Sequence, residues 1–119
     1  MRVLVVEDDE SIRESVVDAL EFSGFQVVSA PDGMEALRWL AQNPLPCAMV
    51  LDLLMPMMTG LDVLESLKGS RPEVIARTVV VSASPNLLRD VTPFGVSVTL
   101  SKPFELPALI AAVQKATAS

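Results

Sequence analysis

The feature that most constrains the fold is a regular alternation between two kinds of segment along the chain. Short, nearly continuous apolar runs rich in β-branched residues stand at 3–6, 27–28, 48–51, 79–81 and 96–100. Runs of this kind are typical of strands that are covered on both faces. Between them, apolar residues recur at every third or fourth position, which predicts amphipathic helices. Because parallel strands need a crossover of helix length, the alternation predicts an α/β fold with a five-stranded parallel sheet.

Turn and capping residues agree with this alternation. Gly24 follows the last turn of the first helix, where a left-handed residue commonly ends a helix, and Gly69 ends the third helix. Pro85 can only begin the fourth helix, and Pro93 must end it. We therefore expect five helices, of which the fourth, over residues 86–92, is short or irregular.

Length and composition fit one domain of this kind. The chain has 119 residues, half of them apolar, so we expect a single domain over residues 1–119 with no output domain. The net charge of −6 argues against direct nucleic-acid binding. Asp52 interrupts the longest apolar stretch, so no segment is expected to span a membrane. A single cysteine and the lack of a charged leader before an apolar run favour a reducing, cytoplasmic setting.

Polar side chains stand at the ends of four predicted strands. They are Glu7 and Asp8 after the first strand, Asp52 after the third, Ser82 after the fourth and Lys102 after the fifth. Ligands of an open parallel sheet bind beyond the carboxyl ends of its strands, so we expect these groups to share one edge. Clustered carboxylates repel one another unless they share a cation, and their oxygens suit Mg²⁺. A phosphoryl group at this edge would find a hydrogen-bond donor in Ser82 and a positive charge in Lys102.

Four motifs in this order resemble the receiver domain of response regulators in bacterial two-component systems. They are residues 5–9 (VVEDD), 51–60 (LDLLMPMMTG), 80–83 (VVSA) and 102–104 (KPF). The resemblance covers residues 2–116 and implies a flavodoxin-like three-layer αβα sandwich with strand order 2-1-3-4-5. It also implies a signalling protein rather than a classical enzyme, a phosphoprotein that catalyses its own phosphotransfer within a phosphorelay.

The same resemblance implies a role for each acidic residue. Asp52 is expected to be the phosphoacceptor, which forms an aspartyl phosphate. Asp8 is expected to bind Mg²⁺ directly beside Asp52, while Glu7 acts through water. The backbone carbonyl of Leu54 is expected to be a further ligand of the ion.

Further residues are implied to contact the phosphoryl group or to report its presence. Ser82 is expected to donate a hydrogen bond to a phosphoryl oxygen, and Lys102 to pair with the phosphoryl group or with Asp52. The Lys102–Pro103 peptide is expected to be cis. On the fifth strand this chain has Thr99, where the family usually has an aromatic switch residue. That departure bears on how phosphorylation is signalled outward.

The expected partners follow from what the chain lacks. It contains no histidine, so a phosphohistidine donor must lie on another protein, either a sensor histidine kinase or a histidine phosphotransfer protein. The surface altered by phosphorylation is expected to comprise the fourth helix, the fifth strand and the fifth helix. It should act on a downstream effector protein, on a fused domain or on a second copy in a homodimer. Neither a nucleic acid nor a membrane is expected as a partner.

Three other functions compete with this interpretation. Thr99 and the proline-bounded fourth helix favour an interaction module that keeps the fold without relying on phosphorylation. A flavodoxin-like cofactor binder would need a phosphate-cradling loop after the first strand, where Glu7 and Asp8 would repel phosphate. A phosphatase of the haloacid dehalogenase type would need a second aspartate at the position of Leu54. That apolar side chain cannot orient an attacking water, so we expect slow self-dephosphorylation.

Overall fold

The computed structural model describes residues 1–118. At its centre lies a five-stranded parallel sheet in the order β2-β1-β3-β4-β5. The strands are β1 (Arg2–Val6), β2 (Gln26–Ala30), β3 (Cys47–Asp52), β4 (Thr78–Ser82) and β5 (Val98–Ser101). The predicted α/β fold and its strand order are therefore confirmed.

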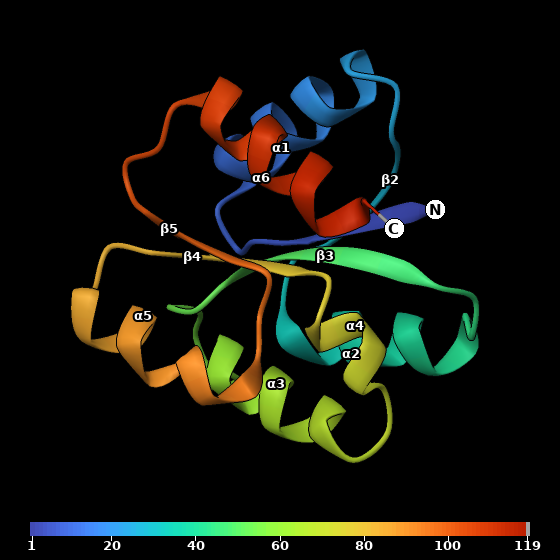
Figure 1. Cartoon of the computed structure of the whole chain (residues 1–119), viewed down its shortest axis with the longest axis vertical. Coiled ribbons are helices and arrows are strands. Elements are labelled where there is room, and N and C mark those ends of the chain that lie inside the picture. The colour runs from blue at the N-terminus through green and yellow to red at the C-terminus, as the bar shows by residue number, and fades with distance from the viewer. Residues whose placement is uncertain (119) are drawn as a thin grey trace.

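Helices cover both faces of the sheet, as Figure 1 shows. On one face lie α1 (Glu10–Phe22) and α6 (Leu106–Thr117). The other face is covered by α2 (Gly33–Gln42), α3 (Gly60–Lys68), α4 (Pro72–Ile75) and α5 (Pro85–Asp90), with the 3₁₀ turn η1 (Thr92–Phe94) after α5. The predicted fourth and fifth helices correspond to α5 and α6.

The expected number of helices was wrong by one. Residues 1–118 contain six α-helices, because a single turn, α4, precedes β4. A four-residue helix is too short to show an apolar repeat of 3.6 residues, and it has no side-chain cap at its N-terminus. Its Val74 and Ile75 are buried against the sheet layer, so tertiary packing accounts for it.

The core consists of two apolar clusters, one on each face of the sheet. Successive side chains of a strand point to opposite faces, so Leu4 and Met49 join the cluster between the sheet and helices α2 and α3. Their neighbours Val3 and Val50 join the cluster between the sheet and helices α1 and α6. Every residue of β3 is buried, which explains the continuous apolar run that precedes Asp52.

Local signals place the helix ends. The side chain of Asp9 accepts a backbone N–H from the first turn of α1, and Thr59 with Asp62 forms a capping box at the start of α3. Gly24 has a positive φ of 96°, as expected after α1, and Gly69 is the C-cap of α3. The caps at Asp9 and Thr59 fix where α1 and α3 begin after β1 and β3.

The predicted short fourth helix is confirmed. The helix α5 has six residues, none of them buried, and η1 continues it as a tighter turn. Ser84 caps α5, since its Oγ accepts the backbone N–H of Leu87 at 3.3 Å. Of the helices that the structure describes over residues 1–118, none is long and apolar enough to cross a membrane.

Candidate functional site

Three carboxylates meet at the carboxyl edge of the sheet. Glu7 and Asp8 follow β1, and Asp52 is the last residue of the neighbouring strand β3. One carboxylate oxygen of each residue lies within 4.8 Å of the others. Glu7 and Asp52 are only 4% and 2% exposed, whereas Asp8 is open to solvent. Asp52 follows Asp8 by 44 positions in the chain. The parallel pairing of β1 with β3 brings the two residues to the same edge.

Lys102 forms the positive centre of this cluster. Its Nζ lies 2.9 Å from Oε1 of Glu7 and 3.3 Å from Oδ2 of Asp52. Burial by itself lowers the pKa of Lys102, but the hydrogen bond to Glu7 and the charge of Asp52 outweigh it, so the net pKa is raised. The ammonium therefore stays charged throughout the neutral range.

The charge of the carboxylates is only partly balanced. Partial burial, followed by a side-chain hydrogen bond with Glu7, raises the pKa of Asp8 above its ordinary value. When all three carboxylates are ionised, Lys102 offsets one of their three charges. The donor set therefore fits a hard divalent cation such as Mg²⁺, and the exposed side at Asp8 leaves room for water in its coordination shell.

Ser82 stands at the end of β4, the strand beside β3 in the sheet. Ser82 is fully buried, and its Oγ accepts the backbone N–H of Ser84 at 3.0 Å. Its hydroxyl proton remains for donation to a ligand. The backbone N–H of Lys102 donates to the Ser82 carbonyl at 2.9 Å, which holds the two strand ends together. The Lys102–Pro103 peptide is cis.

The two remaining predicted residues, Leu54 and Thr99, differ in their distance from the cluster. The backbone N–H of Leu54 donates to Oδ1 of Asp52 at 3.3 Å, while the Leu54 side chain is 53% exposed. Thr99 is exposed on β5 and is paired with Val80, two residues before the end of β4 at Ser82. Leu54 is therefore placed beside Asp52, and Thr99 outside the cluster.

Two residues near the cluster were missed by sequence reasoning. Nη1 of Arg13, on α1, donates to the backbone carbonyl of Glu7 at 2.9 Å. Gly60 lies so close to the end of β3 that a Cβ would stand 2.7 Å from the Asp52 carbonyl oxygen. Nothing in the sequence marks Arg13 as different from other helix arginines. Gly60 had a signal, because a glycine at a helix start often permits a close backbone approach.

Comparison with known proteins agrees with the site. A family model described as the response regulator receiver domain matches residues 3–114. The chain belongs to this family. The response regulator MprA of Mycobacterium tuberculosis is 38% identical over 113 residues, which are 93% of this chain and 48% of that protein. MprA of Mycobacterium leprae is 36% identical over 116 residues, 96% of this chain and 50% of that protein. The receiver chain thus spans about half the length of these curated relatives.

Solved structures agree with the assignment. The chemotaxis protein CheY4 of Vibrio cholerae matches with a TM-score of 0.85 and 27% identity, over 97% of each chain. A response regulator receiver protein from Pseudomonas putida matches with a TM-score of 0.85 and 31% identity, over 97% of this chain and 98% of that one. Receiver domains are signalling proteins rather than classical enzymes, so family membership speaks against the cofactor binder and the phosphatase considered above.

Proposed function

We propose that Asp52 accepts a phosphoryl group from a phosphohistidine on another protein. The observation that supports this most directly is the meeting of Glu7, Asp8 and Asp52 around the Lys102 ammonium. A carboxylate oxygen of Asp52 forms a bond to phosphorus, and the bond between phosphorus and the donor nitrogen breaks. The imidazole nitrogen keeps the electron pair and takes up a proton.

The acidic residues would bind Mg²⁺ in different ways. Asp8 and Asp52 would bind the ion directly, Glu7 would bind it through water, and the Leu54 carbonyl would complete the protein ligands. When bound, Mg²⁺ supplies positive charge to the phosphoryl oxygens in the transition state. Without such charge, the buried Glu7 and Asp52 would repel an incoming phosphoryl group.

Ser82 and Lys102 stabilise the phosphorylated state. The Ser82 hydroxyl donates a hydrogen bond to a phosphoryl oxygen, and the Lys102 ammonium exchanges part of its pairing with Glu7 and Asp52 for the new charge. No polar side chain stands at Leu54 to orient a water. The aspartyl phosphate therefore hydrolyses slowly, and the domain catalyses its own phosphotransfer and slow dephosphorylation.

The altered surface comprises α5, β5 and α6. Ser82 accepts the N–H of Ser84, and Ser84 caps α5, so a movement of Ser82 toward the phosphoryl group pulls on the start of this helix. The surface would act in the cytoplasm on an effector protein, a fused domain or a second copy of the chain. The sensor kinase or phosphotransfer protein would approach the carboxyl edge of the sheet, where Asp8 is exposed.

A second function is favoured by Thr99. This residue is exposed on β5 and lacks the aromatic ring whose rotation would report phosphorylation. The domain would then bind its partner through the same fold without a dependence on phosphate. The two functions differ in the role of Asp52. In the switch, the partner distinguishes the protein phosphorylated on Asp52 from the unphosphorylated protein; in the interaction module, binding does not depend on Asp52.

Phosphorylation can be tested directly. The protein is incubated with Mg²⁺ and acetyl phosphate, and its intact mass is measured beside the Asp52→Asn variant. We expect one phosphoryl adduct on the wild type, none on Asp52→Asn, and none when EDTA removes the metal. A wild type that gains no adduct while Asp52→Asn leaves partner binding unchanged would exclude the switch and leave the interaction module.

A further inference from the structure

Arg13 on α1 contacts the chain on both sides of Asp8. Its Nη1 donates to the carbonyl oxygen of Glu7 at 2.9 Å, and its backbone N–H donates to the carbonyl oxygen of Asp9 at the same distance. These two carbonyls belong to the residues that flank Asp8. The backbone bond is the ordinary i→i−4 bond that opens α1, so the side-chain bond to the Glu7 carbonyl is the contact specific to Arg13.

The contact differs from that of an ordinary surface arginine. The Arg13 side chain is half-buried, and it takes part in no ion pair among those described for residues 1–118. Its guanidinium donates instead to a neutral backbone oxygen, although carboxylates stand close by in the sequence. A charged donor makes a stronger hydrogen bond to a carbonyl than a neutral donor does. The geometry thus directs the arginine to the backbone of the loop.

The Glu7 carbonyl determines the orientation of Asp8. The Glu7 carbonyl and the Asp8 nitrogen belong to one planar peptide unit, so fixing this oxygen fixes the plane from which the Asp8 Cα projects. The preceding peptide is fixed as well, because the Glu7 N–H donates to the Ala30 carbonyl on β2 at 3.2 Å. Asp8 itself is exposed, so few packing contacts restrain its side chain. The orientation of the Asp8 carboxylate therefore depends mainly on the Glu7–Asp8 peptide.

We propose that Arg13 is a positioning residue that aims the Asp8 carboxylate at the divalent cation. The inference rests on the proposed Mg²⁺ site and adds a residue to it that does not touch the ion. Without the guanidinium, the Glu7–Asp8 peptide can rotate and the acid must be ordered when the cation binds. The cost appears as weaker binding of Mg²⁺, as it does when outer partners of metal ligands are removed.

The test measures the dissociation constant of Mg²⁺ by isothermal titration calorimetry, with no phosphoryl donor present. Arg13→Met keeps the length of the aliphatic stem and removes every donor. We expect about tenfold weaker binding in this variant, and partial recovery in Arg13→Lys. The matched control is Arg38→Met, because Arg38 lies on the exposed face of α2 and its ion pair within residues 1–118 is with Glu35. Its affinity for Mg²⁺ should equal that of the wild type.

Salt separates positioning from the long-range effect of charge. Arg13→Met removes a positive charge from the neighbourhood of a cation site, which by itself should tighten Mg²⁺ binding. This opposing effect is screened at about 1 M KCl, where the screening length is about 3 Å, so the deficit of Arg13→Met should persist or increase there. The proposal is overturned if, at that salt concentration, Arg13→Met binds Mg²⁺ as tightly as the wild type. A wild type without saturable Mg²⁺ binding would refute the metal site itself. If the wild type binds and Arg13→Met binds equally well, only the role of Arg13 is refuted.

Discussion

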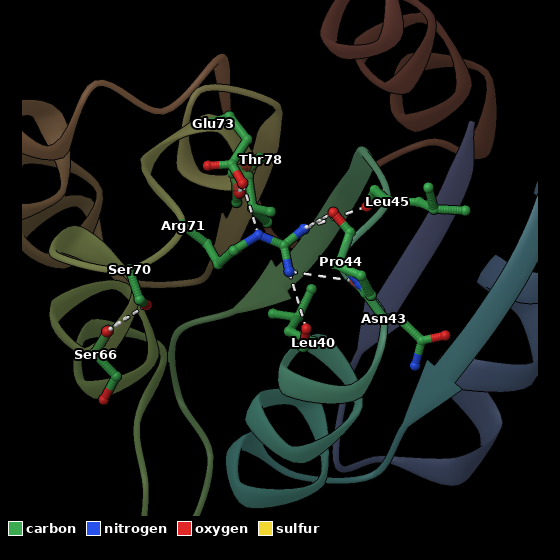
Figure 2. A network of polar contacts seen from close by, with 10 residues as sticks. Leu40, Asn43, Pro44, Leu45, Ser66, Ser70, Arg71, Glu73 and Thr78 are labelled. Carbon is green, nitrogen blue, oxygen red and sulfur yellow. Dashed lines mark hydrogen bonds and ion pairs between the residues drawn. The ribbon is translucent and has the colours of Figure 1, made fainter.

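Arg71 offers a prediction whose size can be worked out from individual contacts. Its guanidinium lies at the junction between α2, the loop before β3 and the start of α4, as Figure 2 shows. The groups that accept its hydrogen bonds are the carbonyls of Leu40 (2.9 Å), Asn43 (3.2 Å), Leu45 (3.2 Å) and Pro44 (3.5 Å) and the carboxylate of Glu73 (2.6 Å). One side chain thus ties two segments that lie 26 to 31 residues apart.

The contacts of Arg71 do not contribute equally. The carbonyls of Leu40 and Asn43 are in partly buried contacts at the end of α2, where the regular i→i−4 ladder stops. The Leu40 carbonyl accepts one further bond there, from the backbone N–H of Asn43 at 3.3 Å. Each bond from a charged donor contributes about 1.5 kcal/mol there. The bonds to Pro44 and Leu45 and the pair with Glu73 are exposed, so water replaces them at little cost. Arg71→Met should therefore lower the free energy of unfolding by about 3 kcal/mol.

The assay is urea denaturation followed by circular dichroism, with a thermal melt beside it. For a chain of this length, about 3 kcal/mol corresponds to a fall of about 10 °C in melting temperature. Arg38→Met is the control, since the ion pair of Arg38 with Glu35 is exposed and contributes less than about 0.5 kcal/mol. Arg71→Lys should lie between the two. If Arg71→Met costs no more than Arg38→Met, the carbonyl contacts do not stabilise the fold and the reasoning is wrong.

Three further variants test the site. Gly60→Ala places a Cβ against the Asp52 carbonyl and should cost about 2 kcal/mol in urea denaturation, whereas Gly69→Ala, with no atom within 4 Å, should stay within about 0.5 kcal/mol. Asp8→Asn should raise the melting temperature at pH 7 without metal, because the raised pKa of Asp8 means that its ionised form opposes folding. This gain in melting temperature should shrink below about pH 4, where the Asp8 carboxyl of the wild type is protonated in both the folded and the unfolded state. In the Asp8→Asn variant, added Mg²⁺ should no longer raise the melting temperature. Leu54→Asn supplies an amide that can orient water, so the phosphorylated protein should lose its label on the order of tenfold faster; an unchanged rate would show that Leu54 does not limit hydrolysis.

The sequence by itself determined the fold and the members of the acidic cluster. Runs such as 48–51 are apolar at every position, which is typical of a strand covered on both faces, and the strand order followed from the resemblance. Once the strands are parallel and in register, Glu7 and Asp52 must end at the same edge. The acidic cluster was predictable because it depends on where strands end, and strand ends are marked locally by the change from apolar to charged residues.

Only the tertiary structure decided how that edge is held together. At that edge Lys102 pairs with Glu7 across 95 positions, and Arg13 and Gly60 lie against backbone carbonyls that have no sequence signature. Arg71 does the same before the start of β3, where it donates to the Leu40 carbonyl. A carbonyl group is present in every residue, so the choice of which one a guanidinium meets depends on the packing of whole elements. The same reason applies to α4, whose single turn forms because two of its side chains are buried. The residue types at the strand ends therefore indicated where the acidic cluster lies, and the packing of whole elements determined its contacts.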